Sequence, residues 1–151
     1  RAHWILLALS WSIPIYYYSK LPNTIPLHFG LHGEADGFGS KLTIWLLPII
    51  ATILLLAIKA QMKHPEKFNY LAKITPKNAE YQYKLQLNLL RYILLVVLLL
   101  FIILDSHTIS LALYDVKILN VLFFPMIVLL IAVPIFVTIH RSTRQYPKSP
   151  R

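Results

Sequence analysis

The chain has 151 residues, of which 57% are hydrophobic and 14% are charged, and it contains no cysteine. A soluble domain carries roughly a quarter charged residues, so this composition excludes a disordered chain and is not that of a water-soluble globule. The lack of cysteine excludes disulfides and thiol chemistry. Because the chain begins with Arg1 rather than Met, we expect a few residues to precede it.

Four apolar stretches are long enough to cross a hydrocarbon core of about 30 Å, which takes ~17–25 helical residues. They cover residues 2–18, 42–58, 85–104 and 118–139. None alternates polar and apolar residues as barrel strands do, so helices are the expected spanning structure. The first stretch lacks the small-residue cleavage site of a signal peptide, and we expect it to be retained. The sequence therefore predicts an all-α integral membrane protein, a single membrane domain over residues 1–151 with four transmembrane helices.

The charged residues predict how these helices are oriented. The segment 59–84 carries six lysines against two glutamates, and the tail at 140–151 is also basic. The connections at 19–41 and 105–117 carry three lysines against four acidic residues. By the positive-inside rule, we expect a multi-pass protein of the cell membrane with the basic segment, the tail and both termini in the cytoplasm. This topology explains the net charge of +9 without nucleic acid, and membrane lipids are the expected partners.

The predicted outer loop at 19–41 differs in composition from the rest of the chain. Pro22 and Pro26 exclude a regular helix and favour extended geometry in its first half. Glycines allow tight turns in the second half, at Gly30, Gly33, Gly37 and Gly39. Ser40 is placed to cap a helix that opens with Lys41. We therefore expect a compact Pro/Gly-rich loop that lies on the outer ends of the helices.

The loop also carries a specific pattern between the first two spans: Leu21-Pro22, Ile25-Pro26, His28-Phe29, Gly33, Ala35-Asp36 and Gly39-Ser40-Lys41. This pattern resembles the amino-terminal membrane domain of the SdpI-type family, a bacterial unit of largely unknown function. The domain occurs in multispanning membrane proteins, including immunity proteins that protect cells from their own secreted toxin peptides. The resemblance implies a small bacterial binding module of the immunity type, whose outer loop recognises a secreted peptide, a lipid or a partner protein.

In that interpretation the ligand-binding residues are the polar and aromatic members of the loop: His28, Phe29, His32, Asp36 and Lys41. The chain contains no glycine-rich phosphate loop, HExxH helix or GxSxG turn. We therefore expect binding rather than catalysis.

A membrane metalloenzyme or hydrolase is an alternative, because imidazole and carboxylate groups bind zinc and other divalent ions. The candidate metal ligands are His28, His32, Asp36 and His107. Four extended residues separate the rings of His28 and His32 by about 13 Å. A metal site therefore requires a turn near Gly30, or an approach of His28 to His107, and without either we expect no cofactor.

A structural subunit of a larger membrane complex is a further alternative. Four spans enclose little interior, and polar residues such as Asn88 and Asn120 are suited to pair with a helix of another protein.

Overall fold

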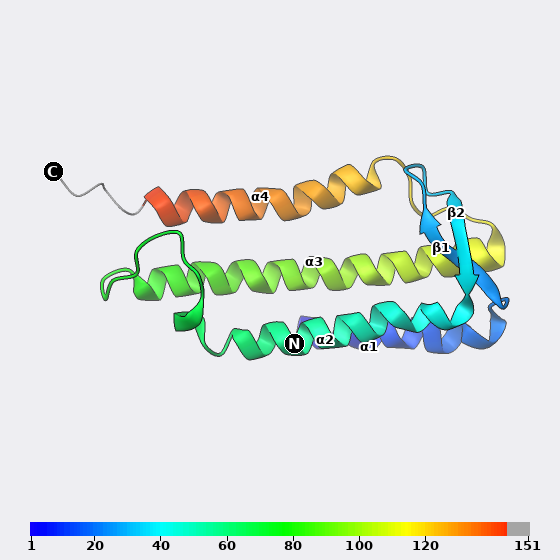
Figure 1. Cartoon of the computed structure of the whole chain (residues 1–151), viewed down its shortest axis with the longest axis horizontal. Coiled ribbons are helices and arrows are strands. Elements are labelled where there is room, and N and C mark those ends of the chain that lie inside the picture. The colour runs from blue at the N-terminus through cyan, green and yellow to red at the C-terminus, as the bar shows by residue number, and fades with distance from the viewer. Residues whose placement is uncertain (145–151) are drawn as a thin grey trace.

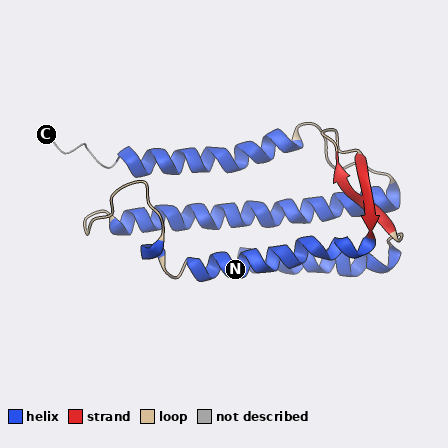
Figure 2. Ribbon diagram, viewed as in Figure 1, coloured by secondary structure: helices blue, strands red, loops and turns tan. Residues whose placement is uncertain are grey.

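The computed structural model describes residues 1–144, so the part of the predicted tail at 145–151 lies outside the described residues. Four helices lie side by side, and a two-stranded antiparallel sheet crosses one end of them (Figures 1 and 2). The helices are α1 (Ala2–Tyr17), α2 (Leu46–Gln61), α3 (Ala79–Tyr114) and α4 (Phe123–Arg144). The strands are β1 (Thr24–Phe29) and β2 (Ala35–Ser40), and short 3-10 helices occupy η1 (Tyr18–Lys20), η2 (Lys41–Trp45) and η3 (Pro65–Lys67).

Within residues 1–144, three helical segments are long and apolar enough to cross a membrane: Lys41–Gln61, Ala79–Tyr114 and Phe123–Arg144. They contain most or all of the predicted second, third and fourth spans. Helix α1 has 16 residues, which is about 24 Å at 1.5 Å per residue and shorter than a hydrocarbon core of about 30 Å. The chain is thus a mostly helical, multi-pass membrane protein with three candidate spans among the described residues, and a small two-stranded sheet accompanies the predicted helices.

Helix α3 extends well beyond the predicted third span. Its 36 residues reach about 54 Å, so the predicted outer connection at 105–117 is helical as far as Tyr114. The helix ends at Asp115, which has a left-handed backbone with φ 53°. The Asp115 N–H donates to the carbonyl of Leu111, and the N–H of Val116 donates to that of Ser110. Aspartate tolerates this conformation better than most residues with a side chain.

The helices pack through a shared apolar core and several polar contacts. Helices α1, α2 and α3 share a core of Leu7, Ala51, Leu55, Leu94 and Leu98. Beside it, Trp11 Nε1 donates a hydrogen bond of 3.0 Å to Thr52 Oγ1, which joins α1 to α2. Helix α4 packs on α3, where Gln82 donates to the carbonyl of Ser142 and accepts from its hydroxyl, both residues being buried.

Charge separates along the length of the molecule. One end holds the connection between α2 and α3 and the last turn of α4 (Figure 1), and it carries the lysines of 59–84 with Arg141 and Arg144. We call it the basic end. The opposite end, which we call the hairpin end, holds β1, β2 and the connection between α3 and α4. The two ends therefore differ in charge as the sequence predicts.

Candidate functional site at the hairpin end

The predicted outer loop folds as a β-hairpin. Strands β1 and β2 pair from Thr24 with Ser40 to Phe29 with Ala35, and the register shifts on both sides of His28. The loop between them closes through the Gly30 N–H, which donates to the Glu34 carbonyl at 2.9 Å. The extended first half is as predicted. In the second half, Gly30 and Gly33 lie in a tight turn as predicted, whereas Gly37 and Gly39 lie in strand β2.

An apolar cluster holds the hairpin on the helix ends. Its buried members come from the start of the hairpin, η2 and α3: Leu21, Ile25, Ile44 and Ile109. Trp45 packs beside them, with its ring centre 5.1 Å from that of Tyr18 and 6.2 Å from that of Trp11. The hairpin is therefore a fixed part of the packed structure.

Ser40 and Lys41 connect the hairpin to the second helical segment. Ser40 Oγ accepts the N–H of Leu42 at 3.3 Å, which confirms the predicted cap. Lys41 Nζ donates to the carbonyl of Leu21 at 3.4 Å and lies 5.1 Å from the ring centre of Tyr18. Lys41 thus stabilises the base of the hairpin.

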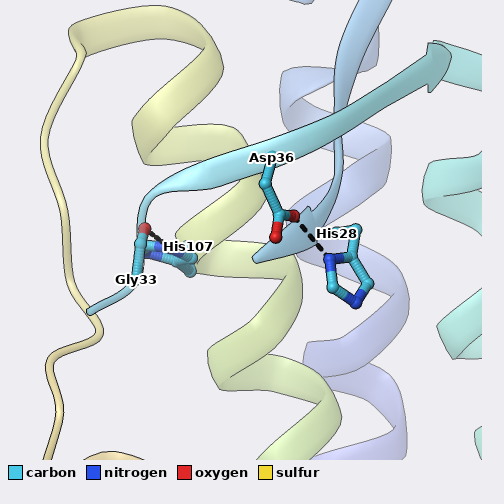
Figure 3. A network of polar contacts seen from close by, with 4 residues as sticks. All are labelled: His28, Gly33, Asp36 and His107. Carbon is cyan, nitrogen blue, oxygen red and sulfur yellow. Dashed lines mark hydrogen bonds and ion pairs between the residues drawn. The ribbon is translucent and has the colours of Figure 1, made fainter. Parts of the chain in front are cut away.

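His107 joins the hairpin to α3 from a completely buried position. Its Nδ1 accepts the backbone N–H groups of Ile118 at 3.1 Å and Leu119 at 3.4 Å. Because Nδ1 is the acceptor, the proton is assigned to Nε2, which donates to the carbonyl of Gly33 at 2.9 Å (Figure 3). The ring of Phe29 packs edge-on against the imidazole, with 4.5 Å between ring centres. This single side chain therefore links the hairpin loop, α3 and the connection to α4.

Gly33 fits this junction because it has no side chain. Its φ is +76°, a conformation that L side chains rarely adopt. A Cβ at this position would lie 2.4 Å from the carbonyl oxygen of Leu119, which belongs to the backbone of the α3–α4 connection. The backbone of the hairpin loop therefore lies directly against the backbone of the α3–α4 connection, and His107 forms hydrogen bonds to both.

His28 and Asp36 form a second polar contact on the exposed side of the hairpin. The distance from His28 Nδ1 to Asp36 Oδ1 is 2.5 Å, and the side chains are 76% and 47% exposed (Figure 3). His32 is exposed in the loop. Because these side chains are exposed, they are open to solvent and to a ligand. A polar contact at such an exposed site contributes little to the stability of the fold.

The structure does not bring the predicted metal ligands together. His28 contacts Asp36, whereas His107 Nε2 bonds to the Gly33 carbonyl (Figure 3). His107 Nδ1 bonds to backbone groups of the α3–α4 connection. Among residues 1–144, no group of three or more His, Asp or Glu side chains is placed to hold a metal ion. The proposed set of His28, His32, Asp36 and His107 is therefore not assembled.

A cavity of about 280 Å³ lies beneath the hairpin, between β1, the start of the second helical segment and α3. Its walls are mainly apolar, and its polar side chains are Thr43, Asp105 and Thr108. Asp105 is only 2% exposed, and its Oδ2 has no hydrogen-bond partner in the described part of the chain. The sequence prediction missed this cavity because it assigned Asp105 to a loop. The available signal was the helical spacing of Asp105, Thr108 and Ile109 on one face.

Comparisons with known proteins find similarity over part of the chain. Residues 5–52 match a family described as a domain of unknown function, DUF1648. A stretch of 53 residues is 45% identical to an uncharacterized protein of the archaeon Archaeoglobus fulgidus, covering 35% of this chain and 29% of that relative. The matched stretch thus spans less than a third of the relative, and no solved structure matches. The segment similar to DUF1648 comprises most of α1, the hairpin, η2 and the first turns of α2.

Proposed function

We propose that this protein is a binding module of the immunity type in the cell membrane, whose hairpin end faces outward and recognises a secreted peptide. The resemblance of the loop pattern to SdpI-type proteins supports the immunity role, and the separation of charge supports the orientation. We include α1 as a fourth span, because η1 continues it towards the hairpin and it packs on both α2 and α3.

The observation that carries this proposal is that the hairpin is preformed. Its inner side is fixed by the buried His107, and its outer side presents the pair of His28 and Asp36. Phe38 is 64% exposed on the same face of β2 as Asp36. A recognition surface that is ordered before binding avoids the entropy cost of ordering it on contact. We assign direct contacts to His28, His32 and Asp36, whereas Phe29 and Lys41 hold the hairpin in place.

The orientation can be tested with single cysteines, because the chain has none of its own. We expect a membrane-impermeant maleimide, added to intact cells, to label His32→Cys in the exposed hairpin loop. The matched variant Lys73→Cys is exposed at the basic end and should be labelled only after the cells are permeabilised. The reverse pattern would contradict the proposed orientation.

The immunity role predicts protection from a toxin peptide. Expression in a strain sensitive to the secreted peptide of an SdpI-type system should allow growth at a toxin dose that kills cells with an empty vector. His28→Ala removes one partner of the exposed contact with Asp36. A hydrogen bond between ligand and a charged group is worth about 1.5–3 kcal/mol, which corresponds to roughly tenfold or more in affinity. The killing dose should fall accordingly.

His64→Ala is the control, because His64 and Glu66 form a similar exposed pair, 3.2 Å apart, at the basic end. This variant should protect as well as the unmodified protein. Unchanged killing despite full expression of the unmodified protein in the membrane would contradict the proposed function. Migration in a large complex on native gels would favour the structural-subunit alternative instead.

A further inference from the structure

The cavity beneath the hairpin contains an acidic group without a partner. Asp105 lies on α3 and is almost completely buried, and its Oδ2 accepts no hydrogen bond from residues 1–144. A buried carboxylate costs several kcal/mol in lost hydration unless a cation or several hydrogen-bond donors face it. Such a group is retained at a cost to the folded state, which is typical of binding sites.

The walls of the cavity supply apolar surface rather than a compensating charge. Among the described residues that line it, none is a lysine, arginine or histidine. Lys41, which directly follows the hairpin and lies two positions before Thr43 of the cavity wall, is engaged with the Leu21 carbonyl and the Tyr18 ring. A ligand would therefore have to bring the positive charge itself.

Two hydroxyl groups line the cavity with Asp105. Thr108 follows Asp105 by three residues on the same face of α3, and Thr43 enters from η2. The Thr43 hydroxyl donates its proton to the Ser40 carbonyl at 2.8 Å, which leaves its oxygen free to accept. An ammonium group has three N–H donors and no acceptor, so one carboxylate and two hydroxyl oxygens match its hydrogen-bonding capacity.

We propose that this cavity binds a protonated amine carried on an apolar stem, with the ammonium against the Asp105 carboxylate. Its volume of about 280 Å³ is just below the usual range for small-molecule sites, so it accommodates one side chain or a small amine. We identify the source of this amine from the proposed function, on which this step rests. In that function the amine is a lysine side chain or the amino terminus of the secreted peptide.

The test uses hexylammonium as the probe and the full chain purified in lipid nanodiscs. The thermal unfolding midpoint should rise with hexylammonium concentration, because a ligand that binds the folded state stabilises it. Hexan-1-ol and hexanoate, which have the same stem without the positive charge, should have much smaller effects. Equal effects of hexan-1-ol and hexylammonium would overturn the assignment of an amine site.

Asp105→Asn should weaken hexylammonium binding at least tenfold while leaving the midpoint of the unliganded protein unchanged or higher. Asp115→Asn is the matched control, because Asp115 lies at the same end but outside this cavity, with a left-handed backbone that asparagine also adopts. It should bind hexylammonium like the unmodified protein. A large loss of unliganded stability in Asp105→Asn, or unchanged binding, would overturn the proposal.

The two proposals can fail separately. If Asp105→Asn loses hexylammonium binding but still protects cells from the toxin, the cavity binds amines and is not the peptide site, which overturns the source proposed above. If the unmodified protein binds hexylammonium but gives no protection, the proposed immunity role fails and the amine site remains.

Discussion

Replacing His107 with alanine is expected to release the hairpin from α3. The change removes one hydrogen bond to the Gly33 carbonyl and the acceptor for the N–H groups of Ile118 and Leu119. An unsatisfied buried polar group costs about 1–3 kcal/mol, and we expect a total loss of about 3 kcal/mol, since the freed chain regains some contacts with water. That loss corresponds to roughly a hundredfold increase in hairpin opening, measured as faster amide hydrogen exchange over residues 24–40.

The expected effect of His107→Ala is local, and this distinguishes it from general misfolding. Amides around Leu55 and Leu98, in the core shared by α1, α2 and α3, should exchange as slowly as in the unmodified protein. His32→Ala is the control, because it removes an exposed imidazole from the same hairpin. If hairpin exchange in His107→Ala matched that of His32→Ala, His107 would not hold the hairpin in place.

The positions of the helices followed from the sequence because they depend on local composition. Uninterrupted apolar runs place α2 and α4 to within five residues and locate the middle of α3, since a bilayer accepts little other than helical backbone. The folded loop on the helix ends and the Ser40 cap were also predictable, from proline and glycine positions and from capping chemistry.

The contacts that build the site depend on residues distant in sequence, and so they were not predictable. Apolar periodicity stops at Leu104, and the polar residues after it suggest a loop. The helix nevertheless continues, because His107 is satisfied by the Gly33 carbonyl, 74 positions away. Strand β2 shows the same effect. Its glycines suggest turns, yet a Cβ at Gly37 would lie 3.0 Å from the Cβ of His28, so tight cross-strand packing favours the small residue there.

Gly33→Ala should destabilise the same junction by a different mechanism. An L residue in the left-handed conformation costs about 1–2 kcal/mol, and here the added Cβ would also lie 2.4 Å from the Leu119 carbonyl oxygen. That neighbour is backbone and yields less readily than a side chain, so the connection after α3 must shift. We expect a total loss of about 3 kcal/mol, measured as a lower unfolding midpoint and faster exchange of the hairpin amides.

Gly30→Ala is the matched control, because a Cβ there meets the end of the flexible Glu34 side chain, which can move away. The double variant Gly33→Ala with His107→Ala provides the sharper test. Once the connection has shifted, the imidazole bond to residue 33 is already lost, so removing His107 as well should cost at least about 1 kcal/mol less than the sum of the single effects. Strictly additive effects would mean that Gly33 and His107 stabilise the protein independently. The hairpin loop, α3 and the α3–α4 connection would then not be held together as one cooperative unit.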